Sequence, residues 1–256
     1  MSNNDLNIDV RAYLIDEPKG STVAFASVTF CAGEEPVSAI NSIRVVIGDN
    51  GPFVTMPQTQ DRNGEFQDVA FPVMKGLRGN ISKAVLAELD SVIKDGLTGS
   101  TNEPHLHFGA KLPGTGEGEV SVEADVNPIR NPRGNTMAFG SVTFKIDDKP
   151  FCTVDGVRVV NSAEKGLFVT MPQSQDKSGE YHDIAFPVMK GLRGQVTEIV
   201  LESYEKAAAE RAADRSGSFS ERLASGKNKA EQYKQKAAQN PVPAMASAKR
   251  GAGLGD

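Results

Sequence analysis

The sequence predicts an α+β fold that contains two homologous domains, and three observations predict it. Sequence blocks in the first half of the 256-residue chain recur in the second half. Each copy begins with several segments in which apolar and polar residues alternate, which is the pattern of half-buried strands. Each copy ends in one segment whose apolar residues recur at helical spacing. Runs of strands followed by a helix, without βαβ alternation, indicate the α+β class.

An internal repeat organises the chain. From Gly51 and Gly166 onward, about 22 of 29 positions are identical. A match of this length indicates a duplicated unit of about 85 residues. We therefore expect one domain over residues 7–94 and a second over residues 120–214. The clearest matching blocks are SVTF at 27–30 and 141–144, FVTMPQ at 53–58 and 168–173, and FPVMKGLRG at 71–79 and 186–194.

The strands of each copy are predicted from a period of two residues. Within residues 23–30, Ala24, Ala26, Val28 and Phe30 share the face opposite Phe25, Ser27 and Thr29, and residues 137–144 repeat the pattern. The connections are short, so we expect neighbouring strands to pair antiparallel. Further strands are expected at residues 9–15, 43–47, 53–56 and 65–71 of the first copy and at residues 121–129 of the second.

The period then changes to that of a helix in both copies. Gly76 and Gly79 are expected in the first turns, where each weakens a helix by about 1 kcal/mol relative to Ala. These glycines leave the start of the first helix open, and we expect the second helix to continue to around Asp214. The apolar stripes are Leu77, Ile81, Ala84, Val85 and Leu89 in the first copy, and Leu192, Val196, Ile199, Val200 and Tyr204 in the second.

Two further segments differ in composition from the repeats. Residues 95–119 are rich in Gly, Pro, Ser and Thr without a period, which is typical of a flexible linker. Residues 215–256 contain few large apolar residues and are expected to be weakly helical or disordered. From Lys206 onward there are 10 Lys and Arg against 5 Asp and Glu, which leaves 18 basic and 28 acidic residues in the body. The tail is therefore basic and the body acidic.

The composition favours a cytoplasmic protein with no membrane contact. No stretch reaches the roughly 20 apolar residues of a membrane helix, and the first ten residues lack the basic and apolar regions of a secretion signal. Cys31 and Cys152 belong to no CxxC or Cys/His cluster. We expect both to be reduced, structural thiols.

The sequence predicts neither an enzyme nor a metal or cofactor site. Of its three histidines, His105 and His107 lie in the linker, where we expect solvated loop side chains, and His182 corresponds to Gln67 in the first copy. No catalytic residue is assigned, because a general base needs a convergent partner. The repeated carboxylate pairs are Glu65 with Asp68 and Glu180 with Asp183. Acid–base chemistry at these pairs is possible, but turn capping and solvation are favoured.

A repeated basic motif is the candidate functional feature. Lys75 and Arg78 flank Gly76 and Leu77 before a predicted helix, and Lys190 and Arg193 repeat the arrangement. A cation beside glycines at a helix N-terminus can present its charge and backbone N–H groups to a phosphate. Three more cations could widen this patch: Arg62 and Lys177 in the preceding turns, and Lys83 on the first helix only.

At these residues the sequence resembles the SpoVG family of bacterial septation and sporulation proteins. The resemblance covers about residues 7–94 and 120–205. It implies small dimeric α+β units that bind DNA and RNA as regulators, through the turn before the last hairpin and the start of the helix. The motifs that carry it are DVRAYLI at Asp9, AFASVTF and AFGSVTF, IRVV and VRVV, GPFVTMP and GLFVTMP, and NGEFQDVAFPV and SGEYHDIAFPV.

The chain departs from the family pattern where the resemblance places nucleic-acid contacts. The family typically has Lys or Arg after the Met-Pro, whereas this chain has residues QTQD at 58–61 and QSQD at 173–176. It also has Phe71 and Phe186 where the family has a His. Fewer cations mean fewer of the phosphate contacts that dominate affinity, so the basic tail is an alternative carrier of binding.

Duplication predicts how the two units assemble. Two units on one chain meet at an effective concentration of about millimolar through a flexible linker. If one unit normally dimerises, the tandem chain should form a monomer with an internal pseudo-dimer. The sequence thus predicts a cytoplasmic DNA- or RNA-binding regulator, and the alternative is a protein-interaction adaptor that keeps the fold but has lost most of the nucleic-acid surface.

Overall fold

The computed structural model describes residues 6–61, 63–94, 107–108, 119–176 and 178–213. Both repeats fall in one compact unit that ends at Ala208, and residues from Ala209 onward form a second unit. The expected basic tail, residues 215–256, lies outside the described residues, as does most of the expected linker.

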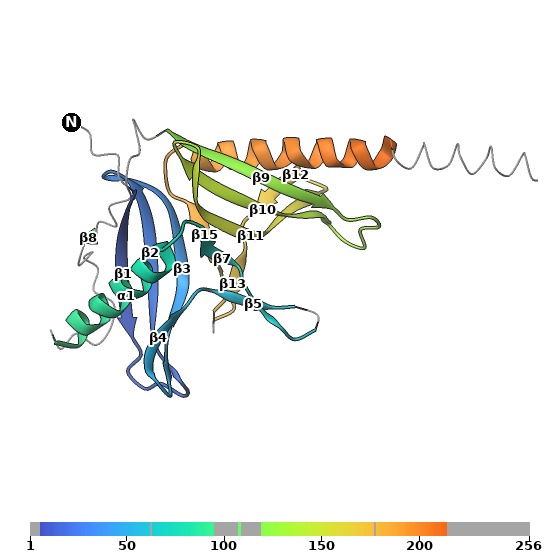
Figure 1. The fold of residues 1–256 in the computed structure, drawn as a ribbon. Helices are drawn as coiled ribbons and strands as arrows, with labels where there is room; N and C mark the ends of the chain where they lie inside the picture. The colour runs from blue at the N-terminus through green and yellow to red at the C-terminus, as the bar shows by residue number, and fades with distance from the viewer. Residues whose placement is uncertain (1–5, 62, 95–106, 109–118, 177, 214–256) are drawn as a thin grey trace, which may run out of the picture. The chain divides into compact units, whose positions relative to one another are not determined.

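The first repeat forms an antiparallel sheet whose core face is covered by a helix (Figure 1). Ala24, Ala26, Val28 and Phe30 are buried on one face of β2, as their alternation predicts. Strands β1 to β4 pair in chain order, and α1 packs mainly on β1. The elements are β1 Leu6–Leu14, β2 Thr22–Ala32, β3 Glu35–Gly48, β4 Gly51–Thr55, β5 Gln58–Gln60, β6 Phe66–Asp68, β7 Ala70–Pro72 and α1 Leu77–Lys94.

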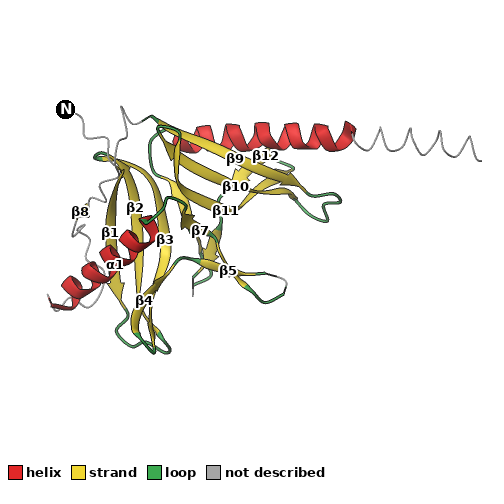
Figure 2. Ribbon diagram, viewed as in Figure 1, coloured by secondary structure: helices red, strands yellow, loops and turns green. Residues whose placement is uncertain are grey.

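The second repeat has the same order of elements, which confirms the α+β class with two homologous domains (Figure 2). Its final helix covers residues 192–213, the last ones described. Its strands are β9 Val120–Pro128, β10 Thr136–Ile146, β11 Lys149–Ser162, β12 Gly166–Thr170, β13 Gln173–Gln175, β14 Tyr181–Asp183 and β15 Ala185–Pro187.

The repeats exchange short strands, and this exchange forms the predicted pseudo-dimer. Strand β7 of the first repeat pairs with β11 of the second, and β15 of the second pairs with β3 of the first. Ala70 lies opposite Val154, and Ala185 lies opposite Ile40. These positions are equivalent in the repeat alignment, so the two exchanges share one register. An internal pseudo-two-fold relates them.

One predicted strand is divided in two by this exchange. Residues 65–71 were expected to form one strand, but β6 pairs with β5 in a local hairpin, and β7 leaves for the other repeat. Val69 stands between them. Its N–H donates to the Pro57 carbonyl at 2.8 Å, and its carbonyl accepts from the Asp155 N–H at 2.7 Å. The partner therefore changes within a single residue.

Strand β3 extends well before the predicted segment 43–47, because its first half pairs with β15. Its two halves meet at a β-bulge, where the register with β2 shifts between Ala26 and Val28. Ser42 lies at the bulge with a φ of 60°, and its equivalent Gly156 has a φ of 77°. A bulge bends a strand, and here it separates the half that pairs with β15 from the half that pairs with β4.

The two sheets share one hydrophobic core. Phe151 on β11 is fully buried, with its ring centroid 5.3 Å from that of Phe30 in the other repeat and 6.3 Å from that of Phe144 in its own. The buried residues of both helices belong to the same cluster, including Leu77 and Leu192. Because the core is continuous, unfolding of one repeat would expose apolar surface of the other.

The helix starts differ from the expectation at one glycine. Helix α1 begins at Leu77, so Gly76 precedes the helix rather than lying in its first turn. Gly76 and its equivalent Gly191 both have a φ of 82°, a conformation that glycine adopts without the steric cost of a side chain. Gly76 therefore suits the turn that leads into the helix. Gly79 does lie in the first turn, as expected.

The expected linker contains a short strand. β8, His107–Phe108, pairs antiparallel with β1 at Ile8 and Asp9. The backbone of His107 is therefore part of the sheet edge rather than of a loop, while His105 lies outside the described residues. Neither long helix, as far as the structure describes them, is apolar enough over a sufficient length to cross a bilayer.

Candidate nucleic-acid interface

The two local hairpins are closed by aspartate turns. In the β5–β6 hairpin, Asp61 Oδ1 accepts hydrogen bonds from the backbone N–H groups of Asn63 and Glu65, at 2.8 and 2.9 Å. Asp176 makes the equivalent bonds in the β13–β14 hairpin. A short carboxylate that bonds its own backbone stabilises such turns. Arg62 and Lys177, which the sequence analysis proposed as part of the basic patch, lie outside the described residues.

A hydrogen-bonded chain connects the first hairpin to α1. Gln58 on β5 donates through Nε2 to Asp68 Oδ1 on β6, at 3.0 Å. The guanidinium of Arg78, in the first turn of α1, forms an ion pair with Asp68 Oδ2. Arg44 on β3 donates to Gln58 Oε1 at 3.3 Å. Asp68 is therefore held from both sides and fixes the hairpin against the helix start.

The second repeat contains the glutamine–aspartate–arginine part of this chain. Gln173 Nε2 donates to Asp183 Oδ1 at 2.9 Å, and Arg193 bonds Asp183 Oδ2 at 3.0 Å. The carboxylates are mostly buried, with 22 % of the Asp183 side chain exposed, whereas 61 % of the Arg193 side chain remains exposed. Each arginine thus reaches inward to a carboxylate and still meets solvent.

Three other predicted cations are exposed near the helix starts or on α1. Lys75 and Lys190 are exposed in the turns that precede the two helices, and Lys83 is exposed on α1. The structure therefore brings Arg78 and Arg193 onto the hairpins and places a lysine beside each helix start. Each repeat therefore has one exposed lysine before its helix and one ion-paired arginine in the first turn of that helix.

The ion pairs shape what these patches can bind. A guanidinium has five N–H donors, so Arg78 and Arg193 can hold a carboxylate and still offer donors to a phosphate. The neighbouring carboxylates cancel part of the positive charge, and an exposed pair of this kind contributes about 0–1 kcal/mol to stability. Each paired arginine is therefore suited to bind a phosphate through directed hydrogen bonds rather than through strong net positive charge.

A cluster in the second hairpin contains side chains of the types that bind metals, but its aspartate stabilises the hairpin turn. Ligand atoms of Asp176, Glu180 and His182 lie within 4.8 Å of one another, and all three residues are exposed. The Asp176 carboxylate already accepts hydrogen bonds from Ser178 Oγ at 2.6 Å and pairs with His182 Nε2 at 2.8 Å. These bonds, that from Ser178 first, hold the pKa of Asp176 well below its usual range.

Sequence reasoning missed the partners of the arginines. Gln58, Asp68 and Arg78 are spaced ten residues apart, and the spacing recurs at Gln173, Asp183 and Arg193. This repeated spacing across a hairpin was a usable signal. In the structure, the glutamines bind the carboxylates that hold the arginines.

Comparison with known proteins identifies the family. A family model described as SpoVG matches residues 6–91 and again residues 121–206. The chain belongs to the SpoVG family. The two matched segments coincide with the two structural repeats, so each repeat is one SpoVG domain.

Individual relatives have about the length of one SpoVG domain. A protein of Oceanobacillus iheyensis that carries the name septation protein SpoVG is 38% identical over 87 residues, which are 34% of this chain and 85% of the relative. A SpoVG 2 protein of Listeria monocytogenes is 40% identical over 95 residues, 37% of this chain and 88% of the relative. A SpoVG protein of Lachnospira eligens is 44% identical over 74 residues, 29% of this chain and 78% of the relative.

Proposed function

We propose that this SpoVG-family protein is a non-enzymatic, cytoplasmic regulator that binds DNA or RNA and acts as a monomer with an internal pseudo-dimer. The observation that carries the proposal is the duplicated patch at the helix starts, with Lys75 and Arg78 in one repeat and Lys190 and Arg193 in the other. Phosphates bind readily at helix N-termini that also present a cation. Two patches on one rigid core would contact two points of one nucleic-acid backbone.

The alternative is a protein-interaction adaptor, and a specific observation favours it. Asp68 and Asp183 form ion pairs with the two arginines and so neutralise part of their charge. Gln58 and Gln173 are uncharged at positions where a cation would strengthen phosphate binding. The acidic body would also repel nucleic acid at long range. A protein partner would then bind the hairpins without dependence on phosphate.

A salt-dependent binding titration tests the proposal. Labelled single-stranded RNA, single-stranded DNA and duplex DNA are titrated with the full chain at several salt concentrations. The Lys75→Ala/Lys190→Ala double variant should bind more weakly, with the slope of log K against log salt reduced by about 0.7 per lost contact to a single strand. The matched control is Lys19→Ala/Lys165→Ala, which removes the same charge from exposed turns elsewhere.

The aspartates provide a test in the opposite direction. Asp68→Asn with Asp183→Asn keeps the side-chain shape and releases both arginines from their ion pairs. If the patches bind phosphate, affinity should rise by about tenfold or less, because the effective positive charge increases. Equal salt slopes for the lysine variant and its control would contradict the proposed site. Binding that disappears on truncation after residue 213 would assign the activity to the tail.

A further inference from the structure

A pocket lies where the second hairpin meets the first repeat. It has a volume of about 420 Å³ and is open to solvent. Strand β3 contributes one residue, and the other five come from β14, β15 and the second helix of the other repeat. The lining residues are Asn41, Tyr181, His182, Asp183, Phe186 and Arg193. The pocket therefore exists only because the two repeats exchange strands.

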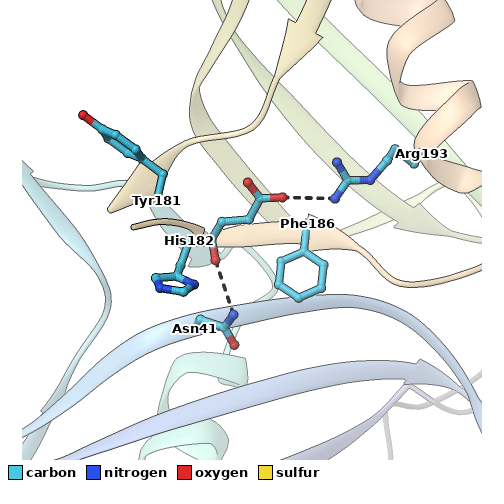
Figure 3. Close-up of a pocket in the computed structure, with 6 residues that line it drawn as sticks. Asn41, Tyr181, His182, Phe186 and Arg193 are labelled. Atoms are coloured by element: carbon cyan, nitrogen blue, oxygen red, sulfur yellow. Dashed lines mark hydrogen bonds and ion pairs between the residues drawn. The ribbon is translucent and has the colours of Figure 1, made fainter. Parts of the chain in front are cut away.

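The pocket combines flat rings with an oriented amide. Asn41 Nδ2 donates to the backbone carbonyl of Asp183 at 3.3 Å, which fixes the plane of the amide. In the view of Figure 3, the rings of His182 and Phe186 lie to the left and right of the hydrogen bond that Asn41 donates, and Arg193 bonds Asp183 Oδ2 at 3.0 Å. An asparagine amide carries a second N–H and a carbonyl oxygen. Asn41 therefore keeps one donor and one acceptor that can form hydrogen bonds with a flat polar ligand.

The pseudo-symmetric position has a different chemistry. The Asn41 N–H donates to the Ile184 carbonyl at 2.7 Å, and the Asp155 N–H donates to the Val69 carbonyl at the same distance. The two backbones are therefore placed equivalently, but a carboxyl group replaces the amide at Asp155. His182 is likewise replaced by Gln67.

The charge at Asp155 makes this position less favourable for a phosphate than the equivalent position of Asn41. The Asp155 side chain is half-buried, and burial raises the pKa of its carboxyl. When ionised, it repels an anionic ligand. The Asn41 side chain carries no such charge. The arginine–aspartate ion pair is the same in both repeats, Arg193 with Asp183 and Arg78 with Asp68, so the difference lies at Asn41 and Asp155.

We propose that the Asn41 pocket holds an unpaired base of a single-stranded nucleic acid, and that the Asp155 position does not. The base would stack on the rings of His182 or Phe186 while Asn41 bonds its polar edge, and Arg193 would bind the adjoining phosphate. Proteins read single strands by such stacking on aromatic rings. The inference rests on the nucleic-acid binding proposed above. It adds that only one of the two equivalent positions binds a base, and that the protein prefers single strands to duplexes.

Reciprocal exchange of the two side chains tests the proposal. Asn41→Asp places the carboxyl group of the equivalent position in the pocket. Asp155→Asn is the matched control, because it makes the reverse change of charge at nearly constant shape. Binding of a fluorescent single-stranded RNA and of a duplex is followed by anisotropy with the full chain at low salt. Asn41→Asp should weaken single-strand binding about tenfold, the effect of about one stacked base, and Asp155→Asn should weaken neither.

A second pair of variants keeps the test decisive if Asn41→Asp disturbs the fold, which circular dichroism would reveal. His182→Gln should weaken single-strand binding, whereas Gln67→His should not. A strand with abasic sites keeps every phosphate but lacks bases. The wild type should bind it less tightly than the parent strand, and His182→Gln should cause no further loss.

Each failure has a distinct meaning. If the wild type binds nucleic acid but the variants at both positions behave alike, the pocket proposal is wrong and the proposed function survives. Equal binding of the abasic and parent strands also overturns the pocket. If the wild type binds no nucleic acid at low salt, both proposals are wrong.

Discussion

Strands β3 and β11 are two versions of one strand with different side chains. Both pair with a three-residue strand of the other repeat in the same register, and both contain a bulge at the equivalent residue. The register is thus compatible with different core volumes, polar groups and backbone preferences. The equivalent pairs that differ in these respects are Val37 and Phe151, Ser38 and Cys152, Asn41 and Asp155, and Ser42 and Gly156.

The difference teaches that the exchange depends on backbone pairing more than on matched side chains. Phe151 fills the centre of the shared core, whereas its equivalent Val37 is smaller and also fully buried. The core is therefore asymmetric although the hydrogen bonding is symmetric. Substitutions along these two strands can separate the two contributions, and those with the largest expected effect come first.

Truncation of Phe151 should cause the largest loss of stability. Phe151→Ala removes the ring that contacts Phe30 and Phe144 and should lower the free energy of unfolding by about 3–5 kcal/mol. Val37→Ala removes less volume and should cost less. Urea denaturation of the full chain measures both. Equal losses of unfolding free energy in the two variants would show that the two positions contribute equally to the core despite their different side chains.

Exchange of the buried polar position should have a smaller effect. Ser38 is buried, and its Oγ has no hydrogen-bond partner among the described residues, whereas Cys152 at the equivalent position is a buried thiol. Cys152→Ser should cost about 1–3 kcal/mol, because Cys152 Sγ lies 3.9 Å from the Thr153 carbonyl and the shorter serine side chain would be buried beyond hydrogen-bond reach of it. Ser38→Cys should instead stabilise the protein. Thermal unfolding of both variants checks the opposite signs.

The bulge residues should respond by about 1 kcal/mol. A left-handed backbone costs a non-glycine residue about 1–2 kcal/mol, so Gly156→Ser should destabilise by about that amount. Ser42→Gly should stabilise, although the greater freedom of glycine in the unfolded chain offsets part of the gain. The same unfolding titrations apply. A destabilised Ser42→Gly variant would mean that the serine side chain contributes more than its backbone costs.

The thiols should show the smallest response, namely none at neutral pH. Burial, with Asp9 adjoining, raises the pKa of Cys31 to about 12 from its ordinary 9.0, and burial alone raises the pKa of Cys152. The reactive thiolate is therefore scarce in the folded protein. We expect no labelling by iodoacetamide at pH 8 until denaturant is added. Because the unfolded thiols ionise first, their contribution to stability should fall as the pH rises from about 9 to about 12.

The sequence alone predicted most of the local elements and the duplication. Alternation in β2 and the helical spacing of Leu77, Ile81 and Val85 report which side chains face a core, and both were confirmed. The repeat offset located the second domain. The basic residues at each helix start were also visible, although the two in the hairpin turns, Arg62 and Lys177, lie outside the described residues.

Only the tertiary structure decided which segments pair across the repeats. The three residues of β7 or β15 are too few to show a period, so nothing local distinguishes pairing with their own sheet from pairing with the other one. The same holds for Arg78 and Asp68, whose contact requires the hairpin to fold back on the helix start. The Asn41 pocket depends on both: Asn41 is 140 or more positions along the chain from the five other lining residues and meets them only through the exchanged strands.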